Sequence, residues 1–248
     1  MGYEESKIEG RNAVLEAFRS GKTIDKLYVL DGCQDGPVKS ITREARKHDT
    51  IINYVAKERL DQLSETGKHQ GVIAVSAAYE YAEVDDILAA AEVKGEPPFI
   101  IILDGIEDPH NLGAIIRTAN QAGAHGVIIP KRRAVGLTPT VARTSAGAIN
   151  YTPVAKVTNI SNTMKELKDK GMWFVCADMD GTRMYDLDMT GPIGLVIGNE
   201  GDGVSPLVKK NCDMVASIPM KGDIDSLNAS VATGVLAYEI VRQRIVKG

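Results

Sequence analysis

The stretch FIIILDGIEDPHNLGAIIRTA, residues 99–119, decides the fold class of the larger part of this chain. It opens with five apolar residues, crosses a polar loop that contains Gly105 and Pro109, and continues from Leu112 with apolar residues at helical spacing. A buried strand, a loop and an amphipathic helix in this order form one unit of a parallel α/β sheet.

The same alternation continues toward the C-terminus. Strands are predicted at residues 99–103, 126–130, 152–157, 172–177, 193–197 and 214–218. Helices are predicted at residues 112–122, 138–145, 160–170, 206–211 and 229–246. This pattern predicts an α/β domain with a mostly parallel sheet and helices on both of its faces.

A smaller α/β domain precedes this one. Its predicted order is helix 12–18, strand 26–30, helix 38–48, strand 51–55, short helix 59–63 and strand 72–76. An acidic, alanine-rich segment then ends in the breaker Gly95-Glu96-Pro97-Pro98, which is typical of a linker that holds a short helix. We therefore predict a small N-terminal domain at residues 1–78, a linker at 79–97 and a larger domain at 98–248.

The composition is that of an ordinary globular protein. The chain has 248 residues, enough for two domains, and is 44% hydrophobic and 25% charged. No uninterrupted apolar run approaches the roughly 18 residues of a membrane span, so we expect a cytoplasmic protein. The cysteines Cys33, Cys176 and Cys212 lack CxxC spacing, which indicates neither a disulfide framework nor a zinc site.

The net charge of −4 is distributed unevenly. No Asp or Glu occurs between Asp108 and Glu166, and this gap holds the cations Arg117, Lys131, Arg132, Arg133, Arg143, Lys156 and Lys165. Affinity for a polyanion comes from local clusters of this kind rather than from net charge. The gap therefore favours a phosphate-binding face over a chance run of solvated cations.

Ligands of an open parallel sheet bind beyond the carboxyl ends of its strands, where three loops are candidates. The first, at residues 104–113, leads into the helix that carries Arg117. Asn111 either caps this helix or faces a polyanionic ligand together with Arg117, because the positive end of the helix points to the strand ends.

The second loop follows the strand at 193–197 and reads Gly198-Asn199-Glu200-Gly201-Asp202-Gly203. Three glycines in six residues permit either a close approach of the backbone to a ligand or a tight turn. Their order does not match the dinucleotide fingerprint GxGxxG, and the lysine of a P-loop is missing.

The third loop follows the strand at 214–218 and passes through Met220 before it reaches Ser226-Leu227-Asn228 at the C-terminal helix. Ser226 or Asn228 would cap that helix, and capping alone would account for these residues.

Together the three loops closely resemble the three motifs of the SpoU (TrmH) family of RNA 2'-O-ribose methyltransferases, in the same order. The matching segments are Asn111-Leu112-Gly113 with Arg117, Val196-Ile197-Gly198-Asn199-Glu200-Gly201, and Ile218-Pro219-Met220 with Ser226-Leu227-Asn228-Ala229-Ser230. The resemblance covers the chain from about residue 98. It extends to Glu9-Gly10-Arg11-Asn12-Ala13-Val14 and His69-Gln70-Gly71, which are similar to the family's ribosomal-protein-like substrate-binding domain.

The resemblance implies a deep trefoil knot of the SPOUT type near the C-terminus, a homodimer, and S-adenosylmethionine bound in the knot. Backbone groups at Gly198, Ile218 and Leu227 would hold this cofactor, with Met220 beside its adenine. The candidate RNA-binding residues are Arg11, Asn12, His69, Gln70, Lys131, Arg132, Arg133 and Arg143.

The implied reaction is an in-line displacement with a neutral thioether as leaving group, so neither a general acid nor a metal is required. The family gives the residue matching Arg117 the central role. Because a guanidinium is a poor base, we expect Arg117 to stabilise the developing alkoxide. Glu200 either orients Arg117 or accepts the hydroxyl proton, while Asn111, Ser226 and Asn228 position the ribose and its phosphate.

The two-domain layout most resembles enzymes that methylate a guanosine of 23S rRNA, although close relatives modify tRNA. A non-catalytic RNA-binding protein that keeps the fold is an alternative. A haloacid-dehalogenase-type phosphatase is another, because Asp178-Met179-Asp180-Gly181-Thr182 is similar to its nucleophile motif. That pattern is incomplete, since its second acidic partner after Gly203 is missing.

Other residues are expected to be structural. We predict a loop at Asp178–Thr182, a core position for Trp173, and structural roles for His110 and His125.

Overall fold

The computed structural model describes residues 7–223 and 226–247, and the chain forms two compact units. Unit 1 comprises the chain up to Glu80 together with Gly136–Pro139, and unit 2 comprises Tyr81–Val135 and the chain from Thr140 onward. The predicted α/β class is confirmed in both.

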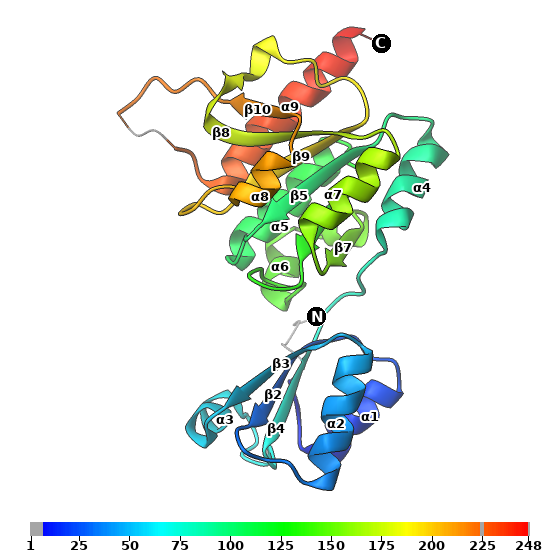
Figure 1. Ribbon diagram of the computed structural model, residues 1–248, viewed down its shortest axis with the longest axis vertical. Coiled ribbons are helices and arrows are strands. Elements are labelled where there is room, and N and C mark those ends of the chain that lie inside the picture. Colours follow the sequence, from blue (N-terminus) through cyan, green and yellow to red (C-terminus); the bar gives the residue numbers. More distant parts are fainter. Residues whose placement is uncertain (1–6, 224–225, 248) are drawn as a thin grey trace. The chain divides into compact units, whose positions relative to one another are not determined.

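Unit 1 is a four-stranded sheet with the order β1-β4-β2-β3. Its elements are β1 (Lys7–Glu9), α1 (Arg11–Arg19), β2 (Ile24–Leu30), α2 (Gly36–Lys47), β3 (Ile51–Val55), α3 (Lys57–Leu63) and β4 (Val72–Ser76). Helices α1 and α2 lie on one side of the sheet and α3 on the other (Figure 1). Alternate strand residues such as Leu27 and Val29 are fully buried against α1 and α2, as the period of a strand requires.

Strand β1 is the element of unit 1 that the sequence did not predict. It has three residues and pairs antiparallel with β4, Lys7 opposite Val75 and Glu9 opposite Ile73. A strand this short, with charges at both ends, has no apolar pattern of its own, so the pairing with β4 determines it.

The described residues of unit 2 form six strands and six α-helices. The strands are β5 (Phe99–Asp104), β6 (Gly126–Pro130), β7 (Val154–Val157), β8 (Trp173–Arg183), β9 (Ile193–Gly198) and β10 (Met214–Ser217). The α-helices are α4 (Val84–Lys94), α5 (Pro109–Gln121), α6 (Pro139–Thr144), α7 (Ile160–Asp169), α8 (Pro206–Lys210) and α9 (Ala229–Lys247); the short 3-10 turns are η1 (Ala148–Asn150) and η2 (Met184–Asp186). The first residue of α6, Pro139, belongs to unit 1.

The sheet of unit 2 is parallel throughout, with the order β10-β8-β9-β5-β6-β7. One face packs against α4, α7 and α8 through Ile100, Ile102 and Phe174, all fully buried. Figure 1 shows α7 and α8 on the near side of the sheet and α9 on the far side. Because Asp104 pairs with Gly198, β5 and β9 end side by side, and the first two candidate loops begin next to each other at the carboxyl ends of these strands.

Two structural predictions are wrong in β8. Residues 178–182 form no loop, because β8 continues to Arg183 and pairs again with β10, with Thr182 opposite Ala216 and Arg183 opposite Ser217. Val215 of β10 pairs with Cys176, but the next residue of β10, Ala216, pairs with Thr182. Residues 177–181 of β8 therefore lie outside the regular pairing. Trp173 is no core residue: as the first residue of the strand it is 59% exposed.

The predicted linker contains the expected short helix, α4, whose Ile87 is fully buried in the core of unit 2. His125 has the predicted structural role, since its Nδ1 accepts a hydrogen bond of 3.0 Å from the Phe99 amide. Among the described residues no helix has the length and apolarity that a membrane crossing needs.

Candidate functional site

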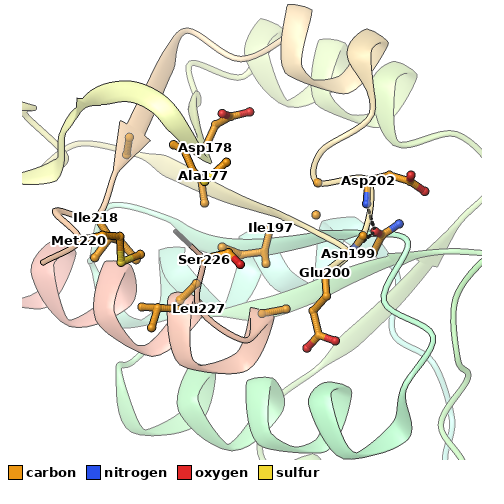
Figure 2. A pocket seen from close by; sticks show the side chains of 17 residues that line it. Ala177, Asp178, Ile197, Asn199, Glu200, Asp202, Ile218, Met220, Ser226 and Leu227 are labelled. Carbon is orange, nitrogen blue, oxygen red and sulfur yellow. Dashed lines mark hydrogen bonds between the residues drawn. The ribbon is translucent and has the colours of Figure 1, made fainter. Parts of the chain in front are cut away.

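A cavity of about 290 Å³ lies beside the middle of β8 and the carboxyl ends of β9 and β10 in unit 2. Gly198, Ile218, Met220 and Leu227, the four predicted cofactor-binding residues, all line it. Figure 2 shows Ile218 and Met220 on one side, Ser226 and Leu227 near the centre, and Asn199 and Asp202 on the opposite side. The second and third candidate loops therefore form one concave site with an apolar side and a polar side.

The glycine loop from Asn199 to Gly203 folds back onto the end of β9. A Cβ atom added at Gly198 would lie 2.0 Å from the carbonyl carbon of Gly203, so no side chain fits at this position. The Asn199 side chain holds the loop, because its Oδ1 accepts hydrogen bonds from the amides of Gly201 at 2.9 Å and Asp202 at 2.6 Å. The structure therefore shows the tight turn, and the close approach at Gly198 is that of the loop backbone to β9.

Three polar side chains meet beside the cavity. Asn111 Nδ2 donates to Glu200 Oε1 at 2.9 Å, and Asn228 Nδ2 donates to Asn111 Oδ1 at 3.0 Å and also to Glu200 Oε1. The Asn228 Oδ1 accepts from the Ser230 amide at 2.9 Å and so caps α9. We call Asn111, Glu200 and Asn228 the amide–carboxylate cluster.

Asn111 does not cap α5. The cap is Asp108, whose Oδ1 accepts from the His110 amide at 2.9 Å, and Pro109 follows in the first turn. Helix α5 thus begins three residues before the predicted start. Asn111 lies inside its first turn with its side chain directed at Glu200, and the residue is only 8% exposed.

Arg117 makes no contact with the cluster. Six residues separate it from Asn111, which on an α-helix rotates the side chain by about 120° and moves it about 9 Å along the axis. Arg117 is exposed, lines neither cavity of unit 2, and makes no hydrogen bond or ion pair with any described residue. Ser226 lines the first cavity but is not part of the cluster.

A second cavity, of about 640 Å³, adjoins the first. The two share the residues Asn199 to Gly203, and Glu200 therefore lines both. Arg132 and Arg133, two of the predicted RNA-binding cations, line the second cavity together with Asn111. The other two predicted cations of unit 2, Lys131 and Arg143, line neither.

The predicted RNA-binding residues of unit 1 form one local structure. The Arg11 backbone amide donates to Gln70 Oε1 and its Nε to the Gln70 carbonyl, both at 3.1 Å, while its Nη2 pairs with Asp35 at 2.6 Å. Gln70 and the adjacent Asn12 are exposed.

His69, by contrast, is occupied within the fold. Its Nδ1 accepts from the Gly71 amide at 3.0 Å, which leaves the proton on Nε2, and Nε2 lies 2.9 Å from Asp61 Oδ1. Because both ring nitrogens are used and the residue is 7% exposed, His69 shapes the loop that presents Gln70 rather than offering a contact of its own.

The sequence missed the wall that β8 contributes to the first cavity. Ala177, Asp178 and Met179 line it; Ala177 ends the predicted strand at 172–177 and the other two follow it, which is the signal that identified the other loops. The Lys209 ammonium donates to Asp178 Oδ2 at 2.5 Å; this contact lowers the pKa of Asp178 and raises that of Lys209.

Comparisons with known proteins agree with this architecture. Residues 98–238 match the model of the SpoU rRNA Methylase family, and residues 7–82 match a model described as RNA 2'-O ribose methyltransferase substrate binding. The chain is 49% identical over 245 residues to YacO of Bacillus subtilis strain 168, assigned to the TrmH family of tRNA/rRNA methyltransferases, with 98% of each sequence covered.

Two solved structures resemble the chain along most of its length. The SpoU methyltransferase AviRb from Streptomyces viridochromogenes, in complex with the cofactor AdoMet, is 28% identical with a TM-score of 0.62 and covers 97% of this chain and 90% of its own. An AdoMet-bound rRNA methyltransferase from Sinorhizobium meliloti is 25% identical with a TM-score of 0.59, at 95% and 86% coverage.

Proposed function

We propose that the substrate of this chain is a guanosine of 23S rRNA. The proposal starts from the family: the chain belongs to the SpoU rRNA methylase family and is an S-adenosylmethionine-dependent RNA 2'-O-ribose methyltransferase. The main structural support for the proposed mechanism is the amide–carboxylate cluster beside the first cavity. The choice of rRNA is supported by the rRNA methyltransferase of Sinorhizobium meliloti, which matches 95% of this chain.

The first cavity fits S-adenosylmethionine. Ile218, Met220 and Leu227 offer an apolar surface to an adenine ring, and the missing side chain at Gly198 lets the Asn199–Gly203 loop pack against the end of β9 beside the cavity. The carboxylate of Glu200 lies on the polar side, where it complements the positive charge of a sulfonium. We infer that Gly198, Ile218, Met220 and Leu227 hold the cofactor, and that Ser226 helps to orient the ribose of the RNA.

When bound, S-adenosylmethionine supplies the methyl group. The O–C bond forms at the ribose 2'-oxygen while the S–C bond breaks, and one proton must leave the hydroxyl. Glu200 is the acceptor we propose, because its Oε1 is held by Asn111 and Asn228 while Oε2 has no hydrogen bond to a described residue. The two amides keep the carboxylate fixed and oriented, and solvent then takes the proton from Glu200.

Arg117 acts, in this proposal, within a homodimer. The apolar residues Val231, Tyr238 and Ile245 on α9 are 50%, 51% and 74% exposed and lie seven residues apart, so they form one stripe along the helix. A second copy of the chain would cover this stripe. The exposed Arg117 of one protomer would then approach the cluster of its partner and stabilise the developing alkoxide.

RNA contacts would involve both units. Arg132 and Arg133 line a cavity beside the cluster, Lys131 and Arg143 extend the basic stretch, and Arg11, Asn12 and Gln70 present polar groups on the unit that matches the substrate-binding model. Phosphate contacts of this kind fix the register of a substrate.

The phosphatase alternative is wrong. The family match assigns a different chemistry, and the carboxylate that would be the nucleophile, Asp178, is bound to Lys209 on the wall of the first cavity. A tRNA substrate remains the second candidate, since YacO is assigned to a family of tRNA/rRNA methyltransferases.

The test is methyl incorporation from labelled S-adenosylmethionine into 23S rRNA and bulk tRNA, with wild type beside Arg117→Ala. We expect the label in 23S rRNA as 2'-O-methylguanosine and its loss in the variant. Label confined to tRNA would overturn the rRNA assignment. Label in neither RNA, with S-adenosylmethionine bound normally, would favour a non-catalytic RNA-binding protein.

A further inference from the structure

The wall that β8 contributes to the first cavity lies outside the regular strand pairing. Residues 177–181, which we call the bulged segment, are in register with neither neighbouring strand: the ladder to β9 ends before them, and the ladder to β10 resumes only at Thr182. Ala177, Asp178 and Met179 of this segment line the first cavity, so its position sets one boundary of that cavity. A segment without ladder bonds depends on other contacts to keep one conformation.

The end of the bulged segment is fixed against β10. The Ser217 hydroxyl donates to the Gly181 carbonyl at 2.9 Å. A Cβ atom added at Gly181 would lie 2.5 Å from the carbonyl oxygen of Val215, so the two backbones are in close contact here. These contacts lie beyond the residues that line the cavity, and they leave the start of the segment to be held by something else.

An ion pair holds the start of the segment. Asp178 Oδ1 accepts from the Asp180 amide at 3.2 Å, and Oδ2 accepts from the Lys209 ammonium at 2.5 Å. The Asp178 and Lys209 side chains are 25% and 36% exposed, so water screens this pair less than it screens a pair on the open surface. Figure 2 shows the Asp178 carboxylate directed away from Ile218 and Met220, so it does not occupy the apolar side of the cavity.

Helix α8, which carries Lys209, is itself anchored. The amide of Ser205, directly before the helix, donates to Asp104 Oδ2 at the end of β5 at 2.8 Å, and Val204 and Val208 are buried in the core of unit 2. The glycine loop, which lines the first cavity, leads directly into this helix. Lys209 therefore ties the bulged segment to the element that follows another part of the same cavity wall.

We propose that Lys209 and Asp178 are positioning residues for S-adenosylmethionine, because their ion pair holds the bulged segment in the conformation that completes the cofactor cavity. The inference rests on the proposed placement of the cofactor in the first cavity. The pair acts through the shape of the wall and is bound to neither member of the cluster that faces the ribose. It therefore contributes to cofactor affinity and not to the methyl-transfer step.

The first test is calorimetric titration of S-adenosylhomocysteine into the full-length Lys209→Met protein, whose side chain keeps its apolar length and loses its charge. We expect the affinity to fall about tenfold. The KM for S-adenosylmethionine should rise by a similar factor, with kcat at saturation within about twofold of wild type. Unchanged affinity, or a fall in kcat without a rise in KM, overturns the proposal.

Two further lysine variants separate the ion pair from general charge effects. Lys210→Met removes the adjacent, exposed cation of α8, which has no ion pair with a described residue, and should bind S-adenosylhomocysteine as wild type does. Lys209→Arg keeps the charge and should restore the affinity to within about twofold. An equal loss in Lys209→Met and Lys210→Met would overturn the role of the pair.

A double-mutant cycle tests whether the two residues act together. Asp178→Asn should weaken S-adenosylhomocysteine as much as Lys209→Met does, and the double variant should lose no more than either single variant. Titration of S-adenosylmethionine should give the same factors, because the wall has one shape for both ligands. Losses that add, or a loss for the charged sulfonium alone, would show a different role.

Hydrogen–deuterium exchange of the protein without ligand measures the position of the wall directly. In Lys209→Met and Asp178→Asn, amides of residues 177–181 should exchange faster than in wild type, while the unfolding temperature stays within a few degrees. Exchange that is unchanged in this segment, or that rises throughout unit 2, would contradict a local positioning role.

Failure of this inference differs from failure of the proposed function. Wild-type protein that does not bind S-adenosylhomocysteine would refute the proposed cofactor site itself. Wild-type protein that binds it, beside a Lys209→Met variant of equal affinity, would refute the inference and leave the function intact.

Discussion

At the scale of single residues, Asn228 has two roles that the sequence presented as alternatives. Its Oδ1 caps α9, and its Nδ2 donates to Asn111 and Glu200. An amide can do both because it has an acceptor at one end and a donor at the other. Fixing the amide by the cap orients the donor, so the helix end itself positions the functional group.

Glu200→Gln tests the proton acceptor. Glutamine keeps the size of the side chain and one acceptor but cannot take the hydroxyl proton, so we expect kcat to fall about 100-fold or more. Single-turnover methyl transfer to RNA measures the change. Glu166→Gln, an exposed carboxylate on α7, is the matched control and should retain full turnover. Full turnover by Glu200→Gln would remove the proposed role.

The carboxyl group of Glu9 is expected to make the stability of unit 1 depend on pH in acid. Partial burial opposes its ionisation, but hydrogen bonds from the side chains of Ser64 and Thr66 and from the amides of Glu65 and Thr66 prevail and lower the pKa of Glu9 to about 2. A depressed carboxyl pKa contributes stability above the ordinary value of 4.5, and this contribution is lost as the pH falls from 4.5 to 2.

Thermal unfolding followed by circular dichroism between pH 6 and pH 2 measures this contribution. Wild type should lose stability more steeply below pH 4.5 than Glu9→Gln, which has no proton to bind. Glu58→Gln, an exposed carboxylate on α3, should follow the wild-type curve. Parallel curves for wild type and Glu9→Gln would contradict the assignment.

At the scale of elements, apolar periodicity located nearly every strand and helix of the described chain to within a few residues. It failed where pairing rather than composition decides, as at β1, and at the second half of β8, whose polar residues join the sheet because β10 pairs with Thr182 and Arg183. Very short strands and polar strand segments lack the apolar alternation on which such prediction depends.

Gly198→Ala tests the packing of the glycine loop against β9. The added Cβ would meet the backbone of Gly203 and Val204 at 2.0–2.2 Å, and backbone cannot move aside as a flexible side chain can. We expect the affinity for S-adenosylhomocysteine to fall at least tenfold, measured by calorimetry, and stability to fall by about 1–3 kcal/mol. Gly191→Ala is the control, because its added Cβ meets nothing within 4 Å. Unchanged affinity in Gly198→Ala would show that the loop can be displaced without cost to the cofactor site.

At the scale of the whole molecule, the site lacks the cation that the family motif assigns to it, since Arg117 lies apart from the cluster. The proposed homodimer resolves this. Tyr238→Glu with Ile245→Glu places two charges on the exposed stripe of α9, and we expect a monomer by light scattering with methyl transfer reduced about 100-fold.

Val93→Glu provides the comparison for the dimer. Val93 is 88% exposed on α4, outside the stripe, so its variant should keep both the dimer and the activity. A doubly substituted protein that remains dimeric would place the interface elsewhere, and a fully active monomer would show that Arg117 is not supplied by a partner.

The sequence by itself determined the α/β class, the order of the elements and the loops that form the site, because apolar periodicity and loop composition are local properties of the chain. Only the tertiary structure decided which members of those loops meet. Asn111, Glu200 and Asn228 are separated by up to 117 residues and join through side-chain hydrogen bonds, whereas Arg117, six residues from Asn111, makes no bond to them. The rotation of about 120° between Asn111 and Arg117 follows from their spacing along α5, whereas the convergence of strand ends that joins Asn111, Glu200 and Asn228 depends on packing between distant parts of the chain.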